Sequence, residues 1–150
     1  MIQRLKTQYV ILAAVCFLIV IGLLLISDNP ISKQRSSINL PVFIADSPAE
    51  RTKGLSGREE LPENRGMLFV FDSDAKHSIW MKDMKFNIDA VWLDENKTVV
   101  DVSNNLVPSS YPKNYSPKTN ARYILELPSG QVDARNIAIG TQLSFTTVVD

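Results

Sequence analysis

Alternation of hydrophobic and polar positions marks the start of the folded part of the chain. In "INLPVFIAD" the side chains of Ile38, Leu40, Val42 and Ile44 share one parity, and alternate residues of a strand point to the same face. The pattern predicts a first β-strand. Pro41 falls on the other parity and has no amide hydrogen to donate, which favours a position at the edge of a sheet.

A short helix is predicted directly after this strand, in "SPAERTKG". Ser47 is the expected N-cap, Pro48 takes the first helical position, and Glu50 completes a capping box with Ser47. Gly54 follows the last helical residue, where glycine commonly closes a helix. The predicted helix therefore spans the residues between Ser47 and Gly54.

Four further strands are predicted between Gly66 and Ser103. The run "GMLFVF" is hydrophobic on both faces, so it predicts a central strand that is covered on both sides. "HSIWMK", "FNIDAVWL" and "TVVDVS" follow as short strands, with turns at "DSDAK" and "DENK", so that the stretch from His77 to Asp89 is interpreted as a hairpin. This succession predicts a mainly β domain with one or two short helices, folded as a compact antiparallel barrel or sandwich.

The segment from Asn105 to Asn120 interrupts the regular spacing of strands. It contains three prolines and two tyrosines, and loops of this length are usually functional or disordered. A strand is predicted to resume in "ARYILELP", followed by one or two helical turns in "SGQVDARN", which Asn136 can close in the left-handed conformation. "GTQLSFTTV" is predicted as the last strand.

The first 27 residues differ in composition from the rest of the chain. Tyr9 to Ile26 is a run of 18 residues without a charge, which as a helix spans roughly 27 Å, close to the thickness of bilayer hydrocarbon. A cleavable signal peptide has a shorter apolar core and a small-residue cleavage site, which "LLISDNP" does not offer. The prediction is a transmembrane signal anchor in residues 1–27, a polar tether at 28–37 and a β-rich domain at 38–150.

Charge patterning predicts an orientation and argues against one class of partner. Arg4 and Lys6 precede the span, so a cytoplasmic N-terminus is expected, with the domain in the periplasm or at the cell surface. From Ile38 onward, 12 basic and 15 acidic residues are interspersed, without the basic stripe of a nucleic-acid-binding protein. The single cysteine, Cys16, lies in the predicted span, so the domain is expected to have no disulfide; no cofactor motif is recognised.

Several motifs, taken together, resemble a bacterial and archaeal family known as domain of unknown function 192. They occur over roughly Asn39 to Phe145, in the order "ERTKGLSGREELPENRGMLFVF", "WMK", "IDAVWLD", a proline-rich loop, "YILELPSG" and "IAIG". The resemblance implies a compact β-rich domain, often behind a signal or anchor segment, with no established activity. The chain departs from the family pattern at Asp83-Met84, Asn87-Ile88 and Thr141, whereas the aspartate of the family's Leu-Asp pair is present as Asp89.

Parity places Asp89 on a hydrophobic face of its predicted strand, together with Val91 and Leu93. An unpaired carboxylate there would be strongly unfavourable, so Asp89 needs hydrogen-bond donors or a cation. The candidate cations are Arg58, Arg65 and Lys82. One interpretation is that Asp89 fastens the "GREELPENRG" loop to the sheet, and another is that it acts as the acid or base of a pocket.

Glu126, in "YILELP", is a second carboxylate on a predicted strand and shares its face with Ile124. Two carboxylates on separate strands can perform the acid–base chemistry of a glycosidase if both face one site, so Asp89 and Glu126 are the candidate catalytic residues of an enzyme. A nucleophile elbow is not recognised, because "LSGRE" lacks the Gly-x-Ser-x-Gly frame.

Aromatic side chains suggest a binding site of a different kind. Trp80 and Trp92 could stack on a sugar, with help from Tyr111 and Tyr115 of the long loop. The alternative is that both tryptophans belong to the core, and this interpretation is the stronger one for Trp92, which lies among hydrophobic residues.

Copper is a further possibility, because imidazole and thioether groups select Cu(I) and the chain offers His77, Met81 and Met84. On an extended strand His77 and Met81 would be about 13 Å apart. Packing in the core is therefore the simpler interpretation of the methionines, and no metal site is predicted.

These observations lead to two main hypotheses of function. The first is a non-catalytic binding module of the cell envelope, with an envelope protein or glycan as partner and with the 105–120 and "ELPENRG" loops as its surface. The second is a carboxylate-dependent hydrolase of envelope glycan, and Cu(I) binding is a third hypothesis. The candidate binding residues are Trp80, Lys82, Asp89, Arg58, Arg65, Tyr111 and Tyr115.

Overall fold

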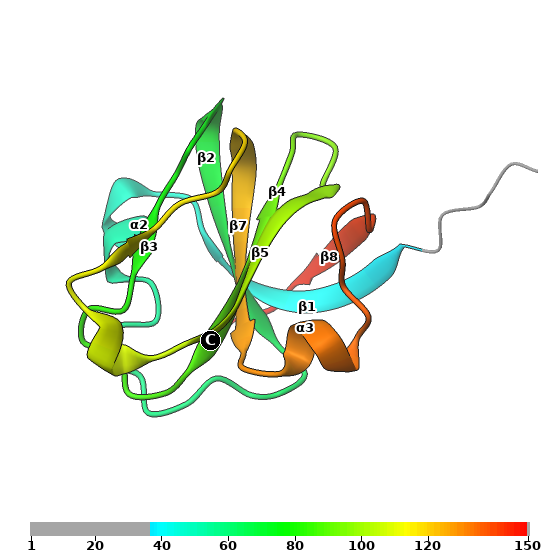
Figure 1. The fold of residues 1–150 in the computed structure, drawn as a ribbon. Coiled ribbons are helices and arrows are strands. Elements are labelled where there is room, and N and C mark those ends of the chain that lie inside the picture. The colour runs from blue at the N-terminus through cyan, green and yellow to red at the C-terminus, as the bar shows by residue number, and fades with distance from the viewer. Residues whose placement is uncertain (1–36, 150) are drawn as a thin grey trace, which may run out of the picture. The chain divides into compact units, whose positions relative to one another are not determined.

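A six-stranded sheet forms the body of the domain in the computed structural model, which describes residues 37–149. The strands are β1 (Ile38–Ala45), β2 (Gly66–Ala75), β4 (Ile88–Leu93), β5 (Val99–Leu106), β7 (Ala121–Pro128) and β8 (Leu143–Thr147). Their order across the sheet is β5-β4-β7-β2-β1-β8. The strands cross at a steep angle, so the sheet curls into half a barrel (Figure 1).

The local predictions for β1, β2 and the first helix are confirmed. Leu40 and Val42 are buried on the face that alternation indicated, and β2 lies inside the sheet with hydrophobic side chains on both faces. Helix α2 (Pro48–Lys53) has the predicted capping box between Ser47 and Glu50. These features depend on residues close together in the sequence, which is why the pattern alone predicted them.

The sheet is mixed, not wholly antiparallel as predicted. β1 runs parallel to both β2 and β8, whereas β2, β7, β4 and β5 pair antiparallel. The segment between β1 and β2, with α2, returns the chain to the end at which β1 began, and parallel pairing requires such a crossover.

The prediction that Pro41 marks an edge strand is wrong, because β8 is the edge. Pro41 is paired with Thr146 of β8 on one side only, since β2 first pairs at Val42.

The stretch from His77 to Asp89 is not a hairpin. β3 (Ile79–Trp80) pairs with β6 (Asn114–Tyr115) in a separate two-stranded sheet, and β4 pairs with β5 and β7. The predicted turn "DSDAK" is also wrong in part, because β2 continues to Ala75. β3 instead pairs with a strand in the long proline-containing segment. The two strands are far apart in the sequence, so the pattern gave no sign of this pairing.

The long segment between β5 and β7 has more structure than the predicted loop. β5 extends to Leu106, a 3-10 helix covers Pro108–Ser110, and β6 follows. Asp101 of β5 is buried, and its Oδ2 accepts a hydrogen bond of 2.7 Å from the backbone N–H of Lys118. This carboxylate therefore fastens the end of the segment to the sheet.

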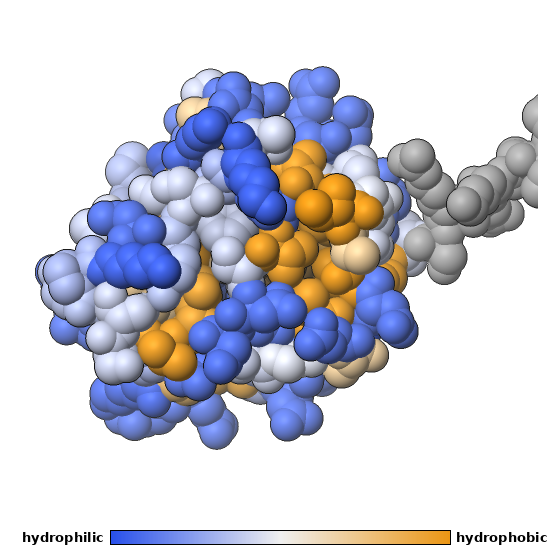
Figure 2. Space-filling model, in the orientation of Figure 1, coloured by the Kyte–Doolittle hydropathy of each residue, from blue (hydrophilic) through white to orange (hydrophobic). Residues whose placement is uncertain are grey.

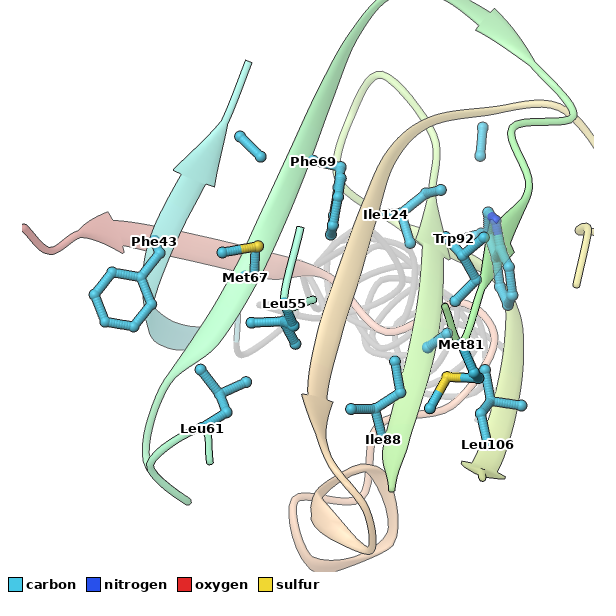
Figure 3. Close-up of a cluster of buried hydrophobic side chains, with 14 residues drawn as sticks. Phe43, Leu55, Leu61, Met67, Phe69, Met81, Ile88, Trp92, Leu106 and Ile124 are labelled. Atoms are coloured by element: carbon cyan, nitrogen blue, oxygen red, sulfur yellow. The ribbon is translucent and has the colours of Figure 1, made fainter. Parts of the chain in front are cut away.

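Hydrophobic side chains form one cluster on each face of the sheet. The first runs from Phe43 on β1 to Leu106 on β5 and includes Trp92, which is fully buried and donates from Nε1 to the carbonyl oxygen of His77 at 2.9 Å (Figure 3). Leu55, after α2, and Met81, after β3, cover this face.

The second cluster lies on the opposite face, where α3 (Gln131–Ala134) contributes Val132. Figure 2 shows an apolar area above α3, between β5 and β8, and these strands contribute the partly buried Val102 and Phe145 to this cluster. Asn136 follows α3 in the predicted left-handed conformation, with φ of 54°. α3 and the residues after it thus cover part of the second face.

The predicted anchor at residues 1–27 and the predicted tether at 28–37, apart from Ser37, lie outside the described residues. Within residues 37–149, none of the helices is long and apolar enough to cross a membrane.

Candidate functional site

A cavity of about 420 Å³ opens between α2, β2 and β3 on the face of the first cluster. Its polar lining includes Arg51, Lys53, Ser78 and Asn114, and one carboxyl group, that of Glu126 on β7. Its hydrophobic lining comprises Leu55, Phe69, Phe71, Ile79, Trp80 and Met84. A largely apolar pocket with a few converging polar groups is the usual form of a small-molecule site.

Glu126 is the buried polar group of this cavity. The residue is 5% exposed, and none of the described residues donates a hydrogen bond to its carboxyl oxygens. Burial raises the pKa of Glu126 from its ordinary value of 4.5 to about 8, because the charged form loses hydration that no protein group replaces. The carboxyl group is therefore mainly protonated at neutral pH, with one O–H donor and one carbonyl acceptor.

Strand register determines the direction in which Glu126 points. It pairs with Met67 of β2 and with Ala90 of β4, and both neighbours belong to the first cluster. Directly paired residues of adjacent strands point to the same face of a sheet. Glu126 therefore lies on the face that α2 and β3 cover, as its predicted parity with Ile124 implied.

The end of α2 forms one wall of the cavity through a close approach to β2. Gly54 closes the helix with φ of 47°, and a Cβ atom there would lie 3.0 Å from Cζ of Phe69. Arg51 is held in place, since its Nη1 donates to the carbonyl oxygen of Val70 at 2.8 Å and its guanidinium lies 5.3 Å from the ring centroid of Phe71. This wall therefore depends both on the local end of α2 at Gly54 and on long-range contacts of α2 with β2.

Trp80 lines the opposite wall of the cavity, and Tyr111 lies beside it. Trp80 and Tyr111 are each 46% exposed, and their ring centroids lie 6.5 Å apart in an edge-to-face arrangement. Tyr115 packs partly buried against the first cluster, beneath the Nζ of Lys113 at 4.5 Å from its ring centroid. Of the four predicted aromatic residues, the structure thus brings Trp80 and Tyr111 together near the cavity, whereas Trp92 belongs to the core.

Asp89 is buried, as parity indicated, but its partners are not the candidate cations. Its Oδ1 accepts from the backbone N–H of Asn105 at 2.9 Å, and its Oδ2 accepts from the backbone N–H of Val132 at 3.1 Å. Asp89 therefore connects the end of β5 to α3, and the interpretation that it fastens the "GREELPENRG" loop is wrong. Two backbone N–H groups provide the hydrogen bonds that the sequence pattern led us to expect from a cation.

The candidate cations lie elsewhere. Arg58 and Arg65 lie over the ring of Phe43, at 5.0 and 5.5 Å from its centroid. Lys82 is exposed, and its carbonyl oxygen accepts a hydrogen bond from Ser56. None of these three residues lines the cavity around Glu126.

Asp89 and Glu126 lie on opposite faces of the same sheet. Asp89 is adjacent in β4 to Ala90, the residue that pairs with Glu126, and successive strand residues alternate between faces. Val132, which donates to Asp89, belongs to the second cluster. The two carboxylates thus do not converge on one site, and the paired chemistry of a glycosidase has no shared cavity here.

The three residues of the copper hypothesis have different surroundings. Met81 is buried in the first cluster, Met84 lines the cavity, and the His77 ring stacks on Phe71 with 3.6 Å between ring centroids. Among residues 37–149, no group of three or more His, Cys, Asp or Glu side chains is placed to hold a metal ion.

Sequence reasoning identified Glu126 and Trp80 but missed the other residues around them. Arg51, Phe71 and Asn114 come from α2, β2 and β6, which are far apart in the chain. The available signal was Glu126 itself, a carboxyl group within the hydrophobic run "YILELP".

Comparisons with known proteins place this fold in a family. The family model of domain of unknown function 192, described as an uncharacterised ACR, matches residues 31–145. A UPF0127 protein of Thermococcus sibiricus is 33% identical over 106 residues, which are 69% of this chain and 65% of that protein. A UPF0127 protein of Pyrococcus furiosus is 29% identical over 117 residues, 75% of this chain and 92% of that one. The chain thus matches slightly less than two thirds of the Thermococcus protein.

A solved structure has the same fold. The crystal structure of a protein of unknown function from Novosphingobium aromaticivorans has a TM-score of 0.63 at 24% identity, over 66% of this chain and 70% of that one. Because the family model covers most of the chain, the protein belongs to the family of domain of unknown function 192.

Proposed function

We propose that this protein is a non-catalytic ligand-binding module of the cell envelope, held at the membrane by its N-terminal segment and facing outside the cytoplasm. The observation that carries the binding part is Glu126, a residue that is 5% exposed. Its carboxyl group has no donor among the described residues and faces a cavity of about 420 Å³. A carboxyl group that reaches a cavity and that no protein group satisfies can form its hydrogen bonds with a bound ligand.

The lining of the cavity supports binding over catalysis. Its charged groups are Glu126, Arg51 and Lys53, and Arg51 already donates to backbone carbonyl oxygens. The second buried carboxylate of the central strands, Asp89, lies on the other face and is satisfied by backbone amides. The site thus offers shape, hydrophobic surface and a few uncharged hydrogen-bonding groups, among them Glu126, Ser78 and Asn114.

The envelope part of the proposal rests on the uncharged run from Tyr9 to Ile26 and the basic residues before it. We expect the full chain to stay in the membrane fraction after carbonate extraction. External protease added to spheroplasts should remove the domain, and a cytoplasmic marker protein should stay intact. Release by carbonate, or complete protection from protease, would contradict this part of the proposal.

The binding part is tested by extracting small molecules from the full chain, purified out of its own membranes in mild detergent. Ser78 lines the cavity and is exposed, so Ser78→Trp should obstruct the opening. Ser73→Trp is the matched control, since Ser73 is also exposed but does not line the cavity. Mass spectrometry should find a compound that accompanies the wild type and Ser73→Trp and is depleted from Ser78→Trp; equal amounts in all three would contradict the proposal.

A further inference from the structure

The polar chemistry of the cavity restricts the class of ligand. A protonated carboxyl group offers an O–H donor and a carbonyl acceptor side by side. None of the described residues donates to Glu126, so its carbonyl acceptor is left for a ligand in the cavity. A ligand that satisfies both must present an acceptor and a donor on neighbouring atoms, which an uncharged carboxamide does.

The other charged side chains of the cavity disfavour a cation. Both are positive, Arg51 and Lys53 of α2, and the lining from β2, β3 and β6 contributes no further charge. An ammonium or amidinium group would have to approach these cations and would also require Glu126 to release its proton. The cavity therefore lacks the second negative charge that would help to hold a cation.

An anion fits the cavity less well for a different reason. A carboxylate ligand could accept the O–H of Glu126, but its second oxygen would then face the carbonyl oxygen of Glu126. Two acceptors without a hydrogen atom between them repel each other, and one of them stays unsatisfied. Lys53 would attract such a ligand but cannot correct this mismatch, because it lies in the exposed end of α2.

The hydrophobic lining indicates what the amide is attached to. Phe69 is buried beneath the end of α2, and Trp80 and Met84 form part of the opposite side. A planar or branched hydrophobic group next to the amide would contact these side chains. We infer that the pocket binds an uncharged carboxamide with a hydrophobic substituent, an inference that rests on the proposed binding function.

Three probes of nearly equal shape separate the alternatives: benzamide, benzamidine and benzoate, which are neutral, cationic and anionic. The full chain in lipid nanodiscs, labelled at methionine and isoleucine methyl groups, is titrated with each at pH 7. Met84 and Ile79 line the cavity and report binding, whereas Ile139 is exposed outside it and serves as the control. We expect benzamide to shift Met84 and Ile79, not Ile139, at a Kd at least about fivefold below the other two.

The pH dependence sharpens this test. Because the pKa of Glu126 is about 8, the protonated fraction falls about tenfold between pH 7 and pH 9, and benzamide affinity should fall by the same factor. In Glu126→Gln, the side-chain amide keeps a donor and an acceptor at every pH, so the slope should disappear. Benzamidine should show the opposite slope with the wild type.

The inference and the proposed function fail in different ways. Tighter binding of benzamidine or benzoate at Met84 and Ile79 would overturn the carboxamide inference and leave a ligand-binding pocket. Absence of shifts with all three probes would also overturn it, and the extraction experiment with Ser78→Trp would still decide the proposed function. Peptides and N-acetylated sugars both carry the amide, so N-acetylphenylalanine amide and N-acetylglucosamine, titrated in the same way, identify the source by the tighter Kd.

Discussion

Two buried carboxyl groups in the central strands of one sheet have opposite surroundings. Asp89 of β4 faces the second hydrophobic cluster and accepts hydrogen bonds from two backbone amides. Glu126 of β7 faces the first cluster and a cavity, and receives no hydrogen bond from the described residues. Equal burial therefore does not imply an equal role: Asp89 stabilises the fold, and Glu126 is kept in an environment that a ligand can improve.

The largest expected effect is the pH dependence that Glu126 gives to stability. Its pKa is raised from 4.5 to about 8 on folding, so the folded chain keeps a proton that the unfolded chain has released. The contribution of this group to the free energy of unfolding is greatest below about pH 4.5. It is lost as the pH rises to about 8, at about 1.4 kcal/mol per pH unit, or roughly 3–5 kcal/mol in all.

The measurement compares urea unfolding of the wild type and Glu126→Gln at several values between pH 4.5 and pH 9, with the full chain in detergent. The free energy of unfolding of the wild type should fall relative to that of the variant as the pH rises. Parallel curves would mean that Glu126 titrates alike in both states, and the contrast with Asp89 would then be lost.

Removal of Asp89 should cause the next largest effect. Asp89→Ala leaves the backbone N–H groups of Asn105 and Val132 without their acceptor, at roughly 1–3 kcal/mol each. We expect the free energy of unfolding to fall by about 3 kcal/mol. Benzamide binding, measured where the variant is folded, should be unchanged, since the cavity is on the other face. A loss of binding without a loss of stability would reverse the roles assigned to the two carboxyl groups.

The sequence predicted features that depend on near neighbours. The capping box of Ser47 and Glu50, the left-handed Asn136 and the parity of Asp89 are local, because each follows from residues within a few positions. Parity predicted the burial of Asp89 but not its partners. The donors are backbone N–H groups, which every residue except proline carries, so they leave no signal in the sequence.

The choice of strand partners could not be predicted in the same way. The stretch from His77 to Asp89 has the alternation of a hairpin, but β3 pairs with β6 and β4 pairs with β5 and β7. Pairing depends on which segments are brought together over long distances, and many arrangements satisfy the same local pattern. The pocket was missed for this reason, since its walls come from α2, β2, β3 and β6.

The smallest effect is also the one whose sign separates the two carboxyl groups. Glu126→Leu replaces a buried polar group that has no protein donor with a hydrophobic side chain of similar volume. At about pH 4 the carboxyl group is mainly protonated in both the folded and the unfolded chain, so we expect a gain of only about 1 kcal/mol in the free energy of unfolding there. Asp89→Leu is the matched control and should lose stability, because two backbone donors would stay buried without an acceptor.

Urea unfolding of both variants against the wild type gives the two signs directly. If Glu126→Leu were destabilising by as much as Asp89→Leu, the carboxyl group of Glu126 would be part of the structural framework. A gain in stability accompanied by loss of benzamide binding would instead mean that Glu126 lowers the stability of the fold and is needed for binding. Lower stability in exchange for binding is expected of a residue whose hydrogen bonds are completed by a ligand.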